Sequence, residues 1–208
     1  MTLTPAVLWL NTVFAAFDMN VTLFIHKLYE MGGGFFTPFF ELVSLLGKGG
    51  IAMIMFAAAM LINKRPRRAG TAVLLGLLVG VIITNLCIKT TVARPRPYAD
   101  ESSIFYQLWI TVGQNMESDY SFPSGHTTAA MAFATALFFT CNKRYSWTAF
   151  IFALLMGVAR VYLCVHFPSD VIGGFIVGFV SGVIGTLIAC KLPRKWYELE
   201  FFGKKGRA

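Results

Sequence analysis

Charged residues are scarce in this sequence. Asp, Glu, Lys and Arg together make up 13% of its 208 residues, against about 25% in soluble globular proteins. Hydrophobic residues make up 56%, against about 45–50% in such proteins. This composition leaves too few charges to cover a soluble surface, which excludes an ordinary soluble domain. It favours a protein embedded in a membrane.

Paired cysteines are also missing. The four cysteines lie in or beside apolar runs, at positions 87, 141, 164 and 190, and no two have the C-x-x-C spacing. This pattern is typical of small buried side chains and argues against a disulfide framework or a zinc site. The sequence has no internal repeat and no low-complexity tract, so we expect one membrane-integral domain over residues 1–208.

Long apolar runs are what the sequence does contain. About twenty apolar residues cross the hydrocarbon core of a bilayer. Five runs approach or reach that length: one near residues 42–63, then Ala69–Ile88, Thr127–Asn142, Tyr145–Val165 and Val171–Cys190. The third is short unless its helix begins within Pro123–His126. The predicted fold class is all-α, a polytopic membrane helix bundle with five transmembrane helices.

The N-terminal region 5–31 leaves two alternatives open. Asn11 and Asp18 are seven residues apart, so a helix would place both on one face. The segment is either a sixth span with this polar stripe turned inward or an amphipathic helix in the membrane interface. Gly32–Gly34 then interrupts the pattern, and Phe35–Leu46 is predicted to be a second interfacial piece.

The net charge of +8 is distributed in a way that argues against a nucleic-acid partner. Twelve of the 18 Lys and Arg residues fall in three clusters on one side of the predicted spans. The positive-inside rule assigns that side to the cytoplasm and the connection of about 91–123 to the outer side. The clusters are Lys64, Arg65, Arg67 and Arg68; Lys143 and Arg144; and Lys191, Arg194, Lys195, Lys204, Lys205 and Arg207.

Charged and imidazole side chains from distant segments are predicted to meet at the outer side. Topology alone places them there, at the outer ends of the spans and in the connections between them. Each has an ordinary structural interpretation, such as a snorkelling lysine or a residue in a first helical turn. Their convergence on one membrane face indicates a site instead. They are Lys89, Arg94, Arg96, His126, Arg160, His166 and Asp170.

The cations in this set favour an anionic ligand. Lys89, Arg96 and Arg160 would repel a divalent metal, and Asp170 is the one nearby carboxylate that the sequence offers to offset them. Guanidinium groups suit a phosphoryl group, whose charge is spread over several oxygens. We therefore expect a phosphate site with no metal and no cofactor.

The two histidines suggest phosphoryl transfer. His166 and Asp170 are four residues apart, so the carboxylate can orient one imidazole nitrogen and leave the other free to attack phosphorus. His126 arrives on another helix and can protonate the leaving oxygen. Backbone N–H groups of Ser124 and Gly125 can hold the oxygens whose charge grows in the transition state.

Three motifs give the chain its resemblance to the type 2 phosphatidic acid phosphatase superfamily. The family motifs K-x6-R-P, P-S-G-H and S-R-x5-H-x3-D correspond to KTTVARPRP from Lys89, PSGH at 123–126 and ARVYLCVHFPSD from Ala159. The resemblance covers about residues 35–190 and implies a membrane-integral lipid phosphatase that needs no metal.

The resemblance implies a role for each matched position. His166 is expected to be the nucleophile that forms a phosphohistidine, His126 the general acid, and Asp170 the residue that orients His166. The expected phosphate ligands are Lys89, Arg96, Ser124, Gly125 and Arg160.

Two positions differ from the family pattern. Ala159 stands where the motif has a serine, which removes one hydrogen bond available to phosphate. A second Arg-Pro pair, Arg94-Pro95, precedes Arg96. The spacing of six residues assigns Arg96 to phosphate and leaves Arg94 as a candidate contact for a lipid headgroup or diphosphate.

The leading hypothesis is a phosphatase that acts on a membrane lipid at the outer face of the cytoplasmic membrane. Family analogy gives undecaprenyl diphosphate, phosphatidylglycerol phosphate, phosphatidate or a lipid A phosphate as the substrate type. A phosphotransferase that resolves the phosphoenzyme with an alcohol is an alternative. A lipid transporter without catalysis is disfavoured, because both histidines and Asp170 are present.

Overall fold

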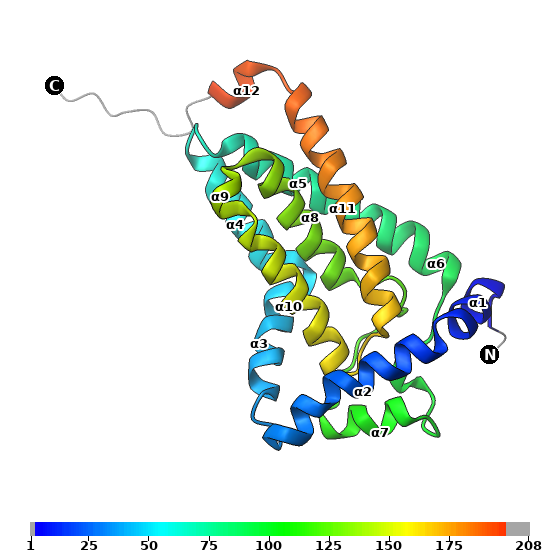
Figure 1. Ribbon diagram of the computed structural model, residues 1–208. Coiled ribbons are helices and arrows are strands. Elements are labelled where there is room, and N and C mark those ends of the chain that lie inside the picture. The colour runs from blue at the N-terminus through cyan, green and yellow to red at the C-terminus, as the bar shows by residue number, and fades with distance from the viewer. Residues whose placement is uncertain (1–2, 199–208) are drawn as a thin grey trace.

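The computed structural model describes residues 3–198 as a set of α-helices joined by short connections and one long loop (Figure 1). The predicted all-α class is confirmed. In chain order the elements are α1 (Pro5–Val13), α2 (Ala15–Gly32), α3 (Thr37–Gly47), the 3-10 turn η1 (Lys48–Gly50), α4 (Ile51–Ile62), α5 (Arg67–Val81), the π-helix η2 (Ile82–Ile88), α6 (Lys89–Val92), the 3-10 turn η3 (Pro97–Ala99), α7 (Ile104–Thr111), α8 (Gly125–Thr140), α9 (Lys143–Ser146), α10 (Thr148–Tyr162), α11 (Pro168–Lys191) and α12 (Arg194–Glu198).

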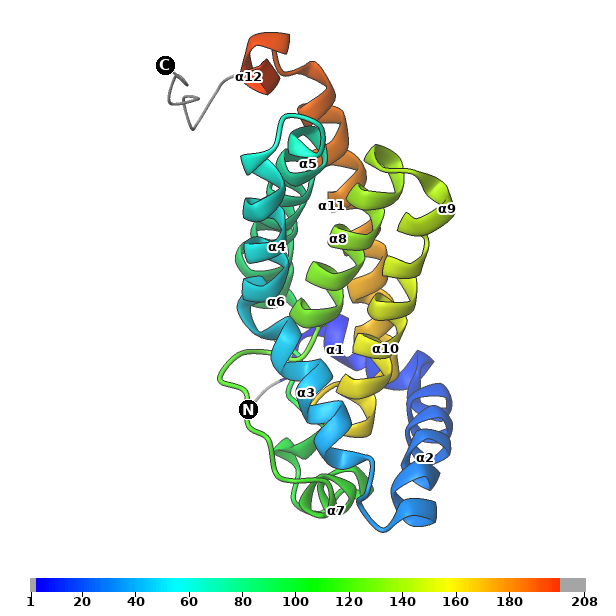
Figure 2. The same cartoon turned by 90° about the vertical axis from the view of Figure 1, so that its left-hand side faces the viewer.

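Four segments of the described chain are long and apolar enough to cross a membrane: Thr37–Ile62, Arg67–Ala99, Lys143–Tyr162 and Pro168–Lys191. They correspond to four of the five predicted spans, with ends that differ by a few residues. The remaining predicted span is α8, which has 16 residues and runs among the longer helices (Figure 2). Helix α8 begins at Gly125, so it includes His126 as the shortness of that apolar run suggested.

Glycine lets α11 pack closely against α5 and α8. A Cβ atom at Gly178 would lie 2.5 Å from the Thr128 carbonyl oxygen of α8, and one at Gly185 would lie 2.3 Å from the Gly76 nitrogen of α5. Backbone atoms cannot move aside as a side chain can, so these positions require glycine. A Cβ atom at Gly174 would lie 2.7 Å from the Ser124 carbonyl oxygen, so the close contact extends to the ends of α8 and α11 that carry His126 and Asp170.

The prediction of an interfacial piece at Phe35–Leu46 is wrong. Helix α3 continues through η1 into α4, so that Thr37–Ile62 is one kinked span. At the kink Gly49 and Gly50 have φ values of 61° and 68°, a conformation that glycine adopts without strain.

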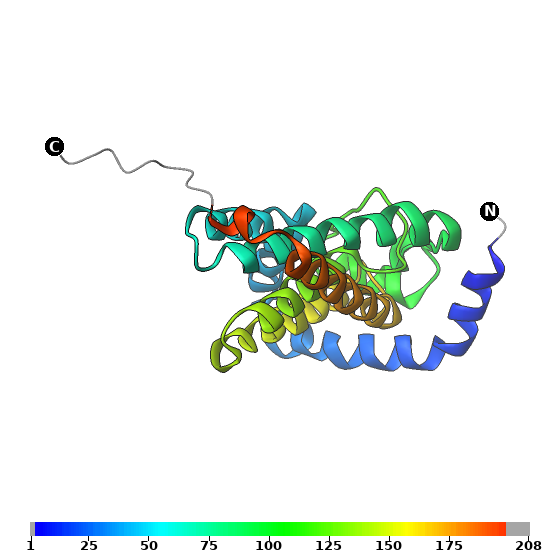
Figure 3. The same ribbon diagram turned by 90° about the horizontal axis from the view of Figure 1, so that it is seen from above.

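The first two helices form an N-terminal belt, residues 5–32, across one end of the bundle. Helices α1 and α2 are bent by 60° relative to each other, and α2 crosses the bundle end where α7 also lies (Figures 1 and 3). The Thr4 hydroxyl at the start of α1 donates a hydrogen bond to the Val92 carbonyl at the end of α6 (2.7 Å). By length and composition the bent pair also qualifies as a fifth span.

The basic connections lie at the opposite end of the bundle. The α4–α5 turn, α9 and α12 lie near the top of Figure 1, whereas α7 and much of the N-terminal belt lie near the bottom. This arrangement agrees with the predicted separation of charge between two membrane faces. Lys204, Lys205 and Arg207 of the last basic cluster lie outside the described residues.

Candidate active site

A cavity of about 300 Å³ lies between the kink at η1, the helix formed by α5, η2 and α6, and the start of α8. Residues far apart in the sequence meet in its wall. They include Lys89, Arg96, Gly125, His126 and His166, all predicted site residues.

His166 lies in the short turn before α11 and is 1% exposed. Its Nε2 atom is 2.9 Å from Nη1 of Arg96, which also donates to the Val165 carbonyl at 2.8 Å. Because a guanidinium can only donate, Nε2 is the unprotonated nitrogen, with its lone pair directed at Arg96. Burial lowers the pKa of His166 well below its usual value, and the Arg96 and Arg160 cations lower it further. The imidazole is therefore neutral at neutral pH.

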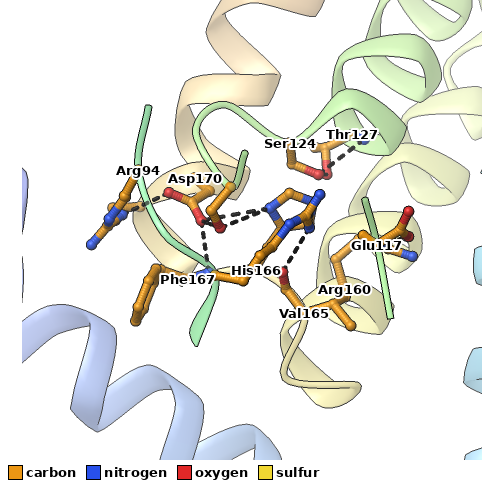
Figure 4. A network of polar contacts seen from close by, with 12 residues as sticks. Arg94, Glu117, Ser124, Thr127, Arg160, Val165, His166, Phe167 and Asp170 are labelled. Atoms are coloured by element: carbon orange, nitrogen blue, oxygen red, sulfur yellow. Dashed lines mark hydrogen bonds and ion pairs between the residues drawn. The ribbon is translucent and has the colours of Figure 1, made fainter. Parts of the chain in front are cut away.

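The Asp170 carboxylate lies on the other side of the His166 ring (Figure 4). Its Oδ2 atom is 3.5 Å from His166 Nδ1, which is longer than a normal hydrogen bond. The same oxygen accepts hydrogen bonds from Ser121 Oγ at 2.6 Å and from the Phe167 N–H at 2.9 Å. The four-residue spacing predicted a direct hydrogen bond between Asp170 and His166 Nδ1. The structure has a longer contact there instead, and Ser121 Oγ lies 3.4 Å from the same nitrogen.

Sequence reasoning missed Ser121. Its side chain is fully buried, and its backbone N–H donates to the Arg94 carbonyl at 2.8 Å. The residue lies two positions before Pro123, just outside the PSGH motif. That proximity was the only signal in the sequence that pointed to it.

The cations predicted to bind phosphate are paired with carboxylates of the long connection. Asp119 binds both Lys89 and Arg96, and Glu117 binds Arg160. Lys89 is 5% exposed and lies inside a helix that continues to Val92, beyond its predicted end. In this state the donors for a phosphate are therefore occupied by the protein's own carboxylates.

Asp119 is held as an anion among these donors. Burial opposes its ionisation, but the hydrogen bonds and charges of Lys89 and Arg96 outweigh burial and hold the pKa of Asp119 below its usual value. The prediction that Asp170 is the one carboxylate near the cations is wrong, because Asp119 and Glu117 also bind them. Loop side chains follow no periodic pattern, so the sequence could not reveal that Asp119 and Glu117 point into the site.

Arg160 lies near the end of α10 and is 2% exposed. Its Nη1 donates to the Ser44 hydroxyl of α3 at 2.5 Å. Its Nε–H is buried and has no partner within residues 3–198. Ala159, at the position of the motif serine, is fully buried. Arg160 thus binds a hydroxyl from another helix and keeps an unused donor.

Ser124 is the N-cap of α8. Its hydroxyl accepts a hydrogen bond from Thr127 Oγ1 at 3.0 Å, and its N–H donates to the Asp170 carbonyl at 3.0 Å. Both groups are engaged, and Ser124 does not line the cavity. The predicted contact between Ser124 and phosphate is therefore not supported. Its observed contacts join the first turns of α8 and α11.

The His126 imidazole lines the cavity and is partly exposed. Within the part of the chain that the structure describes it makes no hydrogen bond. A Cβ atom at Gly47 would lie 2.8 Å from Cδ2 of this ring, so glycine leaves the room that the ring occupies. Both ring nitrogens of His126 are therefore free to meet a ligand.

Arg94 does not line this cavity, although the sequence predicted a headgroup contact there. It lines a second cavity of about 540 Å³, but only 1% of the residue is exposed. Four hydrogen bonds of 2.6–3.0 Å engage its guanidinium, so a headgroup contact is not supported. The acceptors are Asn11, Asp18, Ser169 and Asp170.

Known sequences match this chain over most of its length. The profile of the PAP2 superfamily matches residues 69–193. The undecaprenyl-diphosphatase BcrC of Bacillus subtilis is 30% identical over 137 residues, 64% of this chain and 64% of that protein. A lipid A 4′-phosphatase of Porphyromonas gingivalis is 34% identical over 150 residues, 69% of this chain and 62% of that protein. The matched segment thus spans less than two thirds of either relative.

The fold also has a solved counterpart. The crystal structure of a transmembrane PAP2-type phosphatidylglycerolphosphate phosphatase from Bacillus subtilis superimposes with a TM-score of 0.67, over 91% of this chain and 92% of that chain. At 24% identity this likeness bears on the fold alone, and it supports a multi-pass membrane protein. All three motifs lie within the residues that the family profile matches. The chain belongs to the PAP2 superfamily.

Proposed function

We propose that the protein is a lipid phosphatase that removes the terminal phosphate from a membrane lipid monophosphate or diphosphate through a phosphohistidine on His166. One observation carries this proposal: His166 Nε2 lies 2.9 Å from an Arg96 nitrogen in the cavity wall. A phosphoryl oxygen that replaces Nε2 as the acceptor of the Arg96 hydrogen bond would free the Nε2 lone pair and bring its phosphorus next to it. Positioning and charge stabilisation supply most of the catalysis in phosphoryl transfer.

The reaction has two steps. In the first, His166 Nε2 forms a bond to phosphorus while the bond between phosphorus and the lipid oxygen breaks. His126 donates a proton to that oxygen and becomes neutral. In the second, His126 takes a proton from water, the water oxygen bonds to phosphorus and the N–P bond breaks. Inorganic phosphate leaves, and His126 is again protonated.

The remaining residues stabilise charge. Lys89 and Arg96 bind the phosphoryl oxygens, and the Gly125 backbone at the start of α8 is a further donor in the same cavity wall. Arg160 does not line the cavity, but it binds Glu117, which does, so its cation adds positive charge close to the site. Asp170 faces Nδ1 of His166 and offsets the positive charge that the imidazole gains when it is phosphorylated.

We infer that the substrate phosphate reaches the site from the outer leaflet of the cytoplasmic membrane. The basic connections at the opposite end of the bundle support this orientation. The relatives are named for undecaprenyl diphosphate and lipid A, and the solved structure for phosphatidylglycerolphosphate. The proposed substrate class is therefore a polyprenyl, glyceride or lipid A phosphate whose phosphate group lies in the membrane interface.

A phosphate-release panel tests this function. Purified protein in EDTA would be supplied with undecaprenyl diphosphate, phosphatidylglycerol phosphate, phosphatidate, lipid A and a soluble phosphomonoester. We expect kcat/KM for one lipid to exceed that for the soluble ester by about 100-fold, because remote binding energy of the lipid contributes to turnover. Absence of release from every lipid, or its loss in EDTA, contradicts the proposal. A phosphorylated alcohol formed when glycerol is added would assign a phosphotransferase instead.

Asp119→Asn is expected to strengthen anion binding, because Asp119 competes with phosphate for Lys89 and Arg96. The amide keeps the shape of the side chain and removes its charge. We expect the inhibition constant for orthovanadate, a phosphate analogue, to fall about 5-fold, equivalent to roughly 1 kcal/mol for a partly exposed ion pair. Inhibition of phosphate release from the preferred lipid measures this constant.

The matched control for this variant is Glu101→Gln. Glu101 is an exposed carboxylate of the same connection and does not line the cavity. Its replacement is expected to leave the orthovanadate constant unchanged. A higher constant in Asp119→Asn would mean that Asp119 builds the phosphate site instead of occupying it.

A further inference from the structure

Arg94 is a buried cation that the proposed reaction does not use. Its Nη1 donates to Asp170 Oδ1 at 2.6 Å, and its Nη2 donates to Asp18 Oδ2 at 2.9 Å. Its Nε donates to Asn11 Oδ1 at 3.0 Å. Figure 4 shows the bond from Arg94 to Asp170, which lies next to the His166 ring. Through Asn11 and Asp18 the same guanidinium also binds both helices of the N-terminal belt.

Asp18 also holds the first turn of α11 directly. Its Oδ1 accepts a hydrogen bond from the Ser169 N–H at 2.8 Å, and its Oδ2 accepts one from the Ser169 hydroxyl at 2.8 Å. A carboxylate at this position satisfies a backbone N–H that has no partner within the helix and lies near the positive end of the helix dipole. Because Ser169 precedes Asp170 in the chain, Asp18 fixes Asp170 both through Arg94 and through the backbone.

These three ionised side chains are almost inaccessible. Asp18, Arg94 and Asp170 are 2%, 1% and 0% exposed. Buried charges depend on their partners, because loss of one partner leaves the others uncompensated. With Oδ1 tied to Arg94, the other oxygen of Asp170 is left to face Ser121 and the His166 ring. The direction of that oxygen therefore depends on a residue of α2.

We propose that Asp18 is a positioning residue for phosphoryl transfer, which acts through Arg94 to orient Asp170 and thereby His166. The inference rests on the proposed function, since it concerns the same nucleophile. In this inference the predicted polar stripe of Asn11 and Asp18 is the surface that binds Arg94. The inference also extends the reaction machinery to the N-terminal belt, outside the residues 69–193 that the family profile matches.

The test compares Asp18→Asn with Glu30→Gln, which removes an exposed carboxylate from the same helix α2. For Asp18→Asn we expect kcat per folded protein to fall about 10- to 100-fold, the range typical of residues that orient a reactive imidazole from outside the first contact layer. We expect KM to stay within about 3-fold, because Asp18 does not line the phosphate cavity. The rate of phosphohistidine formation should fall with kcat, and Glu30→Gln should match the wild type.

A double-substitution cycle separates positioning from general weakening of the fold. Because Asp18 acts in part through Arg94, the fold-loss of kcat in the double variant Asp18→Asn/Arg94→Gln is expected to be clearly smaller than the product of the two single fold-losses. The proposal would be overturned if the two single fold-losses of kcat simply multiplied in the double variant. It would also be overturned if Asp18→Asn kept the wild-type kcat, or if the substitution lowered only the yield of folded protein.

A milder variant covers the case in which Asp18→Asn does not fold. Asn11→Ala removes one hydrogen bond to Arg94 and no charge, and we expect it to lower kcat about 3-fold at constant KM. An unchanged kcat in this variant would overturn the inference in the same way. His166→Ala is measured in parallel. Turnover in His166→Ala would refute the proposed function, whereas an inactive His166→Ala beside a normal Asp18→Asn would refute this inference alone.

Discussion

Replacement of His166 by alanine is expected to lower kcat for lipid phosphate release by about 10⁴-fold or more. The imidazole is the proposed nucleophile, and among residues 3–198 no other side chain that lines the cavity accepts a hydrogen bond from Arg96 through a ring nitrogen. The purified variant should also fail to form an acid-labile phosphoenzyme when it is mixed with ³²P-labelled substrate. Phosphate release and radiolabel on the protein are the two measurements.

His26→Gln is the control for this variant. The sequence has three histidines, and His26 lies on α2 and does not line the cavity. It should label and turn over as the wild type does. Phosphoenzyme in His166→Ala would assign another nucleophile. The non-catalytic alternative would be favoured by two results together. The wild type would show no phosphatase activity, and His166→Ala would bind or transport lipid as well as the wild type does.

His126→Ala is expected to lower kcat on the lipid substrate by about 10²- to 10⁴-fold, because the lipid alkoxide then leaves without a proton. p-Nitrophenyl phosphate has a leaving group that needs no proton, so its first step should survive. Phosphohistidine hydrolysis also uses His126, and the phosphoenzyme should therefore accumulate. Rapid mixing would show a burst of about one p-nitrophenol per protein, followed by slow turnover.

His166→Ala provides the comparison, because it should give no burst with either substrate. Loss of the burst in His126→Ala would assign this residue to binding or to the nucleophile. A loss of kcat of equal size on both substrates, without phosphoenzyme accumulation, would also remove His126 from proton transfer. Both ring nitrogens of His126 are free in the cavity wall, so this imidazole can reach the leaving oxygen. Comparing a lipid with p-nitrophenyl phosphate therefore tests directly whether His126 transfers a proton.

Much of the fold could be predicted because membrane spans are local features. Charge-free runs of about twenty residues mark helices such as α5 and α11 without any knowledge of their neighbours. The sequence did not reveal that α3 and α4 form one span, since two positive-φ glycines at 49 and 50 bend the helix without ending it. The placement of the N-terminal belt depends on the distant contacts of Asn11 and Asp18, which no local pattern records.

The residues of the candidate site also fall into those that the sequence could predict and those that it could not. Lys89, Arg96, His126 and His166 meet because helix ends on one membrane face must lie close together, and spacing is enough to predict that. The partners of these residues could not be predicted. Ser121, Asp119 and Glu117 come from a long connection whose path is set by tertiary contacts.

The occupied state of Lys89, Arg96 and Arg160 has a consequence for which phosphates can enter. A tethered carboxylate competes with an effective concentration in the millimolar range, whereas free phosphate must compete from bulk solution. A lipid is confined to the membrane beside the cavity and adds the binding energy of its tail, so it can displace Asp119 and Glu117 where a soluble ion at low concentration does not. After the phosphohistidine has been hydrolysed, no lipid tail holds the phosphate, so the carboxylates would return to the cations and displace it. In the proposed phosphatase we therefore expect these two acids to discriminate against abundant soluble anions and to limit inhibition by the product.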